Sequence, residues 1–193
     1  METVYISDET FNKEDFTQDF LTEGEYENCT FRNCDFSDSD LSNVKFSECE
    51  FSDCNLSLAK LVNAAFRDVK FQNCKMLGLR FEDCNEFGLT FGFADCQLNH
   101  SSFHGRKIKA TVFKNSHLRE VDFTNCDLTN VIFDNCNLAR AAFVNTTLEK
   151  TDFRTAFNYS IDPENNRIKK ARFSLPEIVG LLNKYDIEID GRD

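Results

Sequence analysis

Tryptophan is absent from this chain of 193 residues, proline occurs only twice and glycine only seven times. The few glycines form neither a glycine-rich phosphate-binding loop nor a nucleophile elbow, which argues against two common classes of enzyme. No stretch approaches the roughly 18 apolar residues of a membrane-spanning helix, so no membrane contact is expected. The first residues are acidic and lack the basic and apolar parts of a signal peptide. We therefore expect a cytoplasmic protein.

Phenylalanine, by contrast, is abundant, with 21 copies that follow a regular spacing. From Phe11 to Phe81 a large apolar residue stands at every fifth position, and from Phe93 to Phe153 the same spacing continues in a register displaced by two residues. A period of five fits neither the 3.6-residue stripe of a helix nor the alternation of a strand. The period therefore predicts a repeat structure over residues 1–157.

A second, small residue stands two positions before each large one, as Ala64 does before Phe66. We term the large residue the centre and the small residue the corner of each repeat. The other three positions are mostly charged or polar and are expected to face water. Because one five-residue side cannot bury a core by itself, stability must come from stacking of successive coils.

The segments Cys34–Asp38 and Ser39–Asn43 follow the order small, Asp, Leu or Phe, polar, any residue. This order resembles the pentapeptide-repeat family. The resemblance implies an all-β fold, a right-handed quadrilateral β-helix with four pentapeptides in each coil. At the sheet spacing of about 4.8 Å, about seven coils would form a rod roughly 35 Å long.

The nine cysteines raise the question of a metal site or disulfides. Every one occupies a corner, a position filled elsewhere by Ala, Ser, Val or Thr, and a reduced thiol is a small apolar group that suits such a position. No histidine stands at zinc-ligand spacing from them. His100, His104 and His117 lie on outward positions without a nucleophile partner. We therefore expect no cofactor, no metal and no catalytic site.

Two places interrupt the repeat within residues 85–108. The first break is Glu86, after which Phe91 resumes the old register and Phe93 begins the new one, which places a register shift near residues 85–98. This segment is interpreted either as a bulge or bend of the solenoid or as a recognition site. The second is Arg106, which occupies a corner, where an unpaired charge is costly to bury. We expect a backbone bulge that frees Arg106; pairing with a carboxylate is the alternative.

After Ala156 the repeat lapses, and residues 158–193 are expected to form a C-terminal rung, a helix and a strand. Ser174–Glu177 reads as a capping box with an early proline, which predicts a short helix to about Asn183. Alternation from Tyr185 to Ile189 predicts a strand. This segment should cap the open end of the β-helix, and it either does only that or also forms a symmetric homodimer. The apolar residues proposed for dimerisation are Ile178, Leu181, Leu182, Tyr185, Ile187 and Ile189.

The formal net charge is −11, and it is unevenly distributed. Residues 1–59 contain 15 acidic and three basic residues, whereas residues 60–193 contain 18 acidic and 19 basic residues. The acidic end either keeps the rod soluble or attracts a basic surface on a partner. Direct binding to nucleic acid is not expected, because the charge has the wrong sign. The candidate acidic face consists of Asp35, Asp38, Asp40, Glu48, Glu50 and Asp53.

Two segments, Ser160–Ile168 and Met76–Leu98, resemble the topoisomerase-protecting branch of the pentapeptide-repeat family. They are most similar to the microcin B immunity protein and more distantly to the Qnr quinolone-resistance proteins. The resemblance implies an acidic rod-shaped homodimer, joined at its C-terminal ends, that binds DNA gyrase or topoisomerase IV. Such proteins imitate DNA in part and relieve poisoning by quinolones or peptide toxins. The chain departs from the Qnr pattern in having no long insertion loop between coils. The alternative is a structural adaptor solenoid for an unrelated protein partner.

Overall fold

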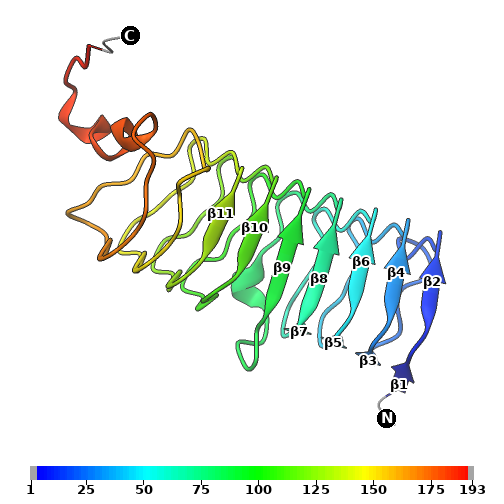
Figure 1. Cartoon of the computed structure of the whole chain (residues 1–193). Helices are drawn as coiled ribbons and strands as arrows, with labels where there is room; N and C mark the ends of the chain where they lie inside the picture. The colour runs from blue at the N-terminus through cyan, green and yellow to red at the C-terminus, as the bar shows by residue number, and fades with distance from the viewer. Residues whose placement is uncertain (1–3, 191–193) are drawn as a thin grey trace.

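The computed structural model describes residues 4–190 and shows a rod built from stacked coils (Figure 1). Outside the register shift, equivalent residues of successive coils pair in parallel 20 positions apart, as Phe11 does with Phe31 and Phe31 with Phe51. Twenty residues make four five-residue sides, which confirms the all-β pentapeptide solenoid predicted from the period. The sequence predicted a repeat region over residues 1–157 and a C-terminal segment over residues 158–193. Residues 1–3 of the first and 191–193 of the second lie outside the described residues.

Two of the four sides of the rod carry parallel β-sheets. The four-stranded sheet contains, in order, β1 (Val4–Ser7), β3 (Gly24–Glu27), β5 (Lys45–Ser47) and β7 (Ala65–Arg67). The seven-stranded sheet contains, in order, β11 (Ile132–Asp134), β10 (Val112–Lys114), β9 (Phe91–Ala94), β8 (Val69–Gln72), β6 (Glu50–Ser52), β4 (Thr30–Arg32) and β2 (Thr10–Asn12). The other two sides are joined by isolated bridges such as Asp35 with Asn55 and Asp40 with Lys60. A single 3₁₀ turn, η1 (Phe81–Asp83), lies before the register shift.

The core consists of the centres, which stack in columns along the rod. Phe31 lies parallel to Phe51 with ring centroids 4.6 Å apart, and it meets Phe46 of the next side edge-on at 5.8 Å. Both arrangements are favoured by aromatic quadrupoles. Burial of each such side chain contributes about 2 kcal/mol of transfer free energy. Stacking therefore supplies the stability that a single five-residue side lacks.

The corners explain the nine cysteines. All nine are free and buried. The Cys54 thiol donates to the carbonyl oxygen of Phe31 at 3.4 Å, and the Thr151 hydroxyl donates to that of Leu128 at 2.8 Å. A corner thus accepts small residues of several types, and most hydroxyls and thiols there find a backbone carbonyl acceptor, in the preceding coil or in their own. The structural interpretation of the cysteines is confirmed.

The turn between sides requires a left-handed residue two positions after most centres. Asn33 and Asn43 have φ of 53° and 62°, and Asn or Asp occupies most such positions. These two residue types tolerate this conformation best after glycine. Much of the Asn and Asp content of the chain therefore has a backbone cause.

The register shift is confined to the surface. β8 pairs with β9 so that Val69 lies opposite Phe91 and Phe71 opposite Phe93, a separation of 22 residues. The sequence predicted that Phe91 resumes the row of centres. In the structure Phe91 occupies a corner position instead. Its buried ring lies 5.4 Å from that of Phe81, next to the place where the loop supplies no large centre. The two additional residues lie in the loop 85–90.

The C-terminal segment contains no α-helix and no strand within the described residues. It forms two 3₁₀ turns, η2 (Ile178–Leu181) and η3 (Asn183–Tyr185), without a side-chain cap. The predicted capping box does not form, because the Glu177 carboxylate accepts a hydrogen bond from the Asn158 backbone at 3.2 Å instead. Gly180 packs so closely on Tyr159 that a Cβ would clash with the Tyr159 carbonyl oxygen. The cap is thus a pair of turns, and the expected helix and the strand at 185–189 are wrong for the single chain.

Candidate protein-interaction surface

Two of the candidate acidic residues stabilise the backbone beside them. Asp35 accepts a hydrogen bond from the Ser37 amide at 2.9 Å, and Asp40 from the Ser42 amide at 3.0 Å. Hydrogen bonds from the Ser42 side chain and backbone hold the pKa of Asp40 below its ordinary value. These carboxylates therefore close turns as well as carry charge.

Three more of these residues, Asp38, Glu48 and Asp53, occupy the left-handed turn positions, with φ of 55°, 54° and 56°. Backbone preference explains the two aspartates. It does not explain Glu48, whose longer side chain gives no such preference. Glu50 lies on β6 and is exposed there. The charges of Glu48 and Glu50 thus have no evident role in forming the turns.

The six acidic residues lie on three of the four sides of the rod and at the turns between sides, rather than on one face. Glu50 lies on the seven-stranded sheet, whereas Asp35 and Asp40 lie on the two sides joined by isolated bridges. Glu48 and Asp53 lie at the turns on either side of β6. The sequence analysis took them as one face because they lie close together in the sequence. Residues close in sequence nevertheless lie on different sides, since the chain turns a corner every five residues. We term these six residues the acidic ring.

The acidic ring makes few ion pairs, although Lys70 lies opposite Glu50 in the seven-stranded sheet. Lys60 lies 3.9 Å from Asp40, and both side chains are well exposed. The other five ring residues make no ion pair within residues 4–190. Their negative field is therefore available to a partner.

The loop 85–90 presents an aromatic side chain to solvent. Phe87 is 78% exposed, and the Arg67 guanidinium lies 5.8 Å from its ring centroid. The loop is held by hydrogen bonds, from Asn85 to Asn63 at 2.9 Å and from the Phe87 amide to Asn85 at 2.9 Å. The sequence analysis offered this segment as a possible recognition site but did not single out Phe87, although it is one of the few phenylalanines outside both registers.

Arg106 keeps a regular corner backbone, so the expected bulge does not occur. Its amide donates to Phe103 at 2.9 Å, as other corners do. The guanidinium donates to the Glu82 carbonyl oxygen and lies 3.6 Å from the Glu86 carboxylate. Arg106 therefore pairs with a carboxylate, the alternative that the sequence left open, and it ties the loop to the coil.

The C-terminal turns expose an apolar surface that includes most of the residues proposed for dimerisation. Leu181 packs partly against the core. Ile178, Leu182, Tyr185, Ile187 and Ile189 are exposed, and so are Leu175 and Val179, which the sequence analysis did not include. The sequence placed Ile178, Leu181, Leu182 and Tyr185 on one face of the expected helix, and they lie instead on or beside the two 3₁₀ turns.

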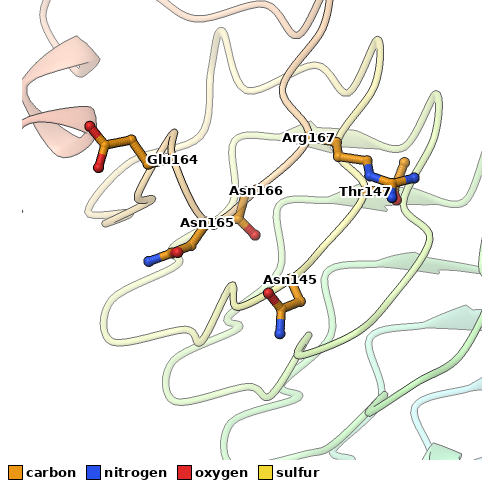
Figure 2. A pocket seen from close by; sticks show the side chains of 6 residues that line it. All are labelled: Asn145, Thr147, Glu164, Asn165, Asn166 and Arg167. Carbon is orange, nitrogen blue, oxygen red and sulfur yellow. The ribbon is translucent and has the colours of Figure 1, made fainter.

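The polar hollow near this end has no catalytic arrangement. It has a volume of about 370 Å³ and is lined by Asn145, Thr147, Glu164, Asn165, Asn166 and Arg167 (Figure 2). Asn166 uses its amide to join the coils, donating to the Phe143 and Asp162 carbonyl oxygens at 2.9 Å each and accepting from the Thr146 amide at 2.9 Å. The hollow is thus a by-product of a structural hydrogen-bond set.

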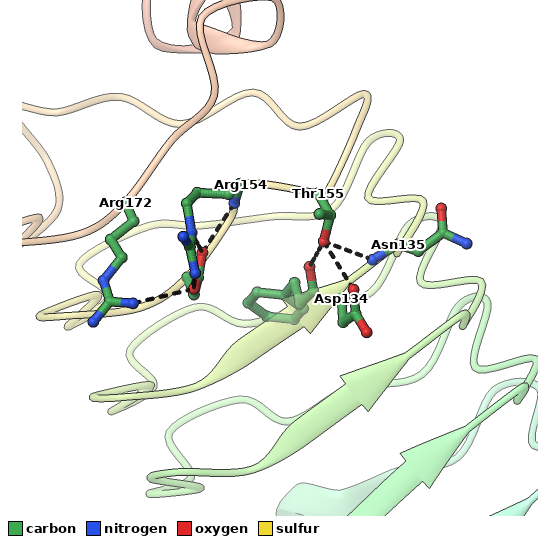
Figure 3. A network of polar contacts seen from close by, with 7 residues as sticks. Asp134, Asn135, Arg154, Thr155 and Arg172 are labelled. Carbon is green, nitrogen blue, oxygen red and sulfur yellow. Dashed lines mark hydrogen bonds and ion pairs between the residues drawn. The ribbon is translucent and has the colours of Figure 1, made fainter.

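Several charges in the C-terminal half are paired with one another. Arg154 and Arg172 lie 2.7 Å and 3.5 Å from the Asp152 carboxylate (Figure 3). The Thr155 hydroxyl beside them donates to Asp134 at 3.1 Å and accepts from the Asn135 amide at 3.0 Å. This half of the rod consequently has a weaker field than the acidic ring.

Two of the three histidines lie beside carboxylates, His100 beside Glu120 at 3.2 Å and His104 beside Asp122 at 3.5 Å. Among residues 4–190, no group of three or more His, Cys, Asp or Glu side chains is placed to hold a metal ion. No helix in this same part of the chain has the length and apolar character to cross a membrane.

Comparison with known proteins identifies the fold. The chain is similar to full-length QnrB1, a plasmid-mediated fluoroquinolone resistance protein, with 17% identity, a TM-score of 0.49, and coverage of 95% of this chain and 100% of that one. It is similar to HetL, a pentapeptide repeat protein involved in heterocyst differentiation regulation from the cyanobacterium Nostoc sp. strain PCC 7120. That match has 14% identity, a TM-score of 0.55, and coverage of 88% and 87%. No curated protein sequence matches the chain significantly.

The family model for the pentapeptide repeat region matches residues 25–92 and 88–153, which together span most of the chain and meet at the register shift. With the 20-residue coil, the stacked centres and the small corners, this match shows that the chain belongs to the pentapeptide-repeat family.

Proposed function

We propose that this protein is a non-catalytic, DNA-mimicking protein that binds DNA gyrase or topoisomerase IV and protects it from a poison, either a quinolone or a peptide toxin. The observation that carries the proposal is charge density. Residues 4–59 contain 14 acidic and three basic residues, and their three coils span about 14 Å at sheet spacing. This is roughly one net negative charge per 1.3 Å, close to the one charge per about 1.7 Å of duplex DNA.

The ring arrangement supports binding in a groove. Carboxylates on several sides of the rod can meet basic side chains on both walls of a DNA-binding groove, whichever side of the rod enters first. The same charge repels nucleic acid itself, so direct binding to DNA is not part of the proposal. The resemblance of Ser160–Ile168 and Met76–Leu98 to the topoisomerase-protecting branch directs the proposal to these enzymes.

The test is whether the purified protein restores gyrase supercoiling in the presence of a poison. A ring variant removes charge while retaining the turns, because Asn keeps the acceptor oxygen and suits the left-handed position. It combines Asp35→Asn, Asp38→Asn, Asp40→Asn, Glu48→Gln and Glu50→Gln. The matched control removes five charges elsewhere, with Asp68→Asn, Asp95→Asn, Asp122→Asn, Asp134→Asn and Glu149→Gln.

The ring variant should lose protection at concentrations where the control variant still protects. Both should unfold at the wild-type temperature. Equal protection by the two variants would reject mimicry by the ring. If the wild type neither binds gyrase or topoisomerase IV nor changes the level of cleavage complexes, the topoisomerase proposal fails.

We also propose a homodimer formed through the exposed apolar residues of the cap. Ile178 and Leu182 are exposed, so replacing both with Asp should give a folded monomer by analytical ultracentrifugation. A wild type that sediments as a monomer at all concentrations would end this part of the proposal.

The alternative is a structural adaptor solenoid for an unrelated protein. The observation that favours it is Phe87, an exposed aromatic held in a well-bonded loop, since aromatic anchors often dominate protein interfaces. Affinity capture dominated by another protein, without a topoisomerase, and lost with Phe87→Ala would support the adaptor. Capture of a topoisomerase that depends on the acidic ring would reject it.

A further inference from the structure

The cap covers only part of the last coil. On the covered part, the Ile161 amide donates to the Gly180 carbonyl oxygen at 2.9 Å and the Asn158 amide donates to the Glu177 carboxylate at 3.2 Å. The next part of the coil, residues 167–173, lacks such a cover. Ile168 and Phe173 pack against the core there but remain partly exposed.

Backbone hydrogen bonds along the rod define what is missing on this edge. In the preceding coil, the Leu148 amide donates to the Arg167 carbonyl oxygen at 2.8 Å and the Lys150 amide to that of Lys169 at 3.0 Å. The equivalent amides one coil further, those of Ile168 and Lys170, have no acceptor within residues 4–190. An unpaired strand edge of this kind is a template for another strand.

The exposed edge of the last coil carries two basic side chains on either side of an apolar one. Arg167 and Lys169 flank Ile168, and neither makes an ion pair within the described residues. Glu149, on the preceding coil, is the acidic residue next to Lys169 along the rod. A strand that adds here should therefore present an apolar residue between two acidic residues, since oppositely charged cross-strand pairs are favourable.

The C-terminal tail of the chain has this sequence. Asp186, Ile187 and Glu188 repeat the order of Arg167, Ile168 and Lys169 with opposite charges. In the single chain the tail is unused: Ile187 is 56% exposed, and no hydrogen bond or ion pair holds residues 186–190 to the described coils. A left-handed turn at Asp186 (φ 50°) directs it away from the coils (Figure 1).

We infer that the tail of a second copy of this chain adds to the open edge as the next rung. Ile187 of the tail lies over Ile168, Asp186 lies opposite Arg167, and Glu188 lies opposite Lys169. The amides of Ile168 and Lys170 then donate to the carbonyl oxygens of the two acidic residues. The inference rests on the proposed homodimer and states how its tails contribute to it.

The reach of the tail is sufficient. Residues 186–190, when extended, span about 17 Å, and the edge belongs to the last coil, next to the apolar surface of the cap. A symmetric dimer would bury two such edges, one from each copy, as closed two-fold interfaces require.

The experiment uses two single charge reversals, Lys169→Glu and Glu188→Lys, in the full chain. Each places like charges opposite each other and should weaken dimerisation about three- to tenfold by analytical ultracentrifugation. A 1:1 mixture of the two variants should form a heterodimer with wild-type affinity, because each tail then meets an edge of opposite charge. Lys114→Glu, which changes the same charge on β10, away from the edge, should dimerise like the wild type.

Amide hydrogen exchange gives the second readout. In the wild-type dimer the Ile168 and Lys170 amides should be protected, and truncation after Tyr185 should remove this protection and weaken the dimer about tenfold or more.

A wild-type dimer that neither reversal weakens, and whose Ile168 and Lys170 amides exchange freely, would overturn the inference while leaving the dimer and the topoisomerase proposal standing. A double variant that carries Lys169→Glu and Glu188→Lys in one chain separates exchange between copies from pairing within one chain. If this double variant dimerises but the 1:1 mixture does not, each tail covers its own edge and the exchange between copies is refuted. A monomeric wild type would overturn both this inference and the dimer, whereas loss of gyrase protection alone would bear on neither.

Discussion

Phe71 stacks on Phe93 with ring centroids 5.3 Å apart and planes 9° from parallel, although 22 residues separate them instead of the usual 20. The column of phenylalanines on the seven-stranded sheet therefore continues without a break across the register shift. The two additional residues are accommodated outside the core, in the loop 85–90. This is why the loop is the place where the surface departs from the repeat.

Removing a ring from the middle of this column should be costly. Phe113 is fully buried and stacks on both Phe93 and Phe133. Phe113→Ala should lower the free energy of unfolding by about 3–5 kcal/mol in urea titrations, because it leaves a cavity between coils. Phe87→Ala, at an exposed position, should change it by less than about 0.5 kcal/mol. Similar losses for the two variants would contradict a core made of stacked centres.

Three of the buried cysteines, Cys49, Cys126 and Cys136, should be chemically inert in the folded protein. Burial raises the pKa of Cys49 to about 11 and that of Cys126 and Cys136 to about 12. The reactive thiolate is therefore scarce at pH 8. A thiol reagent such as DTNB should label none of these three thiols appreciably until denaturant is added, as followed by mass spectrometry. Rapid labelling without unfolding would show that the corners open.

Stability should fall in acid partly through Asp152. A side-chain hydrogen bond from Arg154 is the main cause that holds the pKa of Asp152 below its ordinary value, and the side chain is largely buried. A folded-state pKa below the unfolded one contributes stability that is present above the unfolded pKa of about 3.9 and is lost as pH falls through the folded value. Melting temperatures from pH 7 to pH 2.5 should therefore drop less steeply for Asp152→Asn than for the wild type. If the melting temperatures of the two proteins fell equally with pH, Asp152 would not contribute to the loss of stability in acid.

Arg106 should control the stability of the loop 85–90. Its guanidinium joins the Glu82 carbonyl oxygen and the Glu86 carboxylate. Arg106→Ala should expose the loop to faster hydrogen exchange at the Thr90 amide, which donates to Phe66 at 2.9 Å, with a local loss of about 1–3 kcal/mol. Arg80→Ala removes an arginine of the same region that is mostly exposed, and it should leave this exchange unchanged. An unaltered rate in Arg106→Ala would mean that the loop is held by other contacts.

The five-residue period was sufficient to predict the all-β solenoid, the buried centres and the structural role of all nine cysteines. The reason is that every repeat makes the same contacts, so the pattern of one coil determines that of the next. The acidic composition of the first 59 residues was likewise evident in the sequence.

Four features depended on the tertiary structure. The acidic residues lie on several sides of the rod because the chain turns a corner every five residues. Phe91 takes a corner position because the neighbouring strand sets the register, and Arg106 keeps its regular corner because carbonyl and carboxylate oxygens from other parts of the chain reach it. The predicted cap helix gives way to 3₁₀ turns because the last coil takes the Glu177 carboxylate as an acceptor. A repeat pattern predicts contacts between equivalent positions of successive coils. The contacts of Arg106 and Glu177 join positions that are not equivalent in the repeat, so the pattern could not predict them.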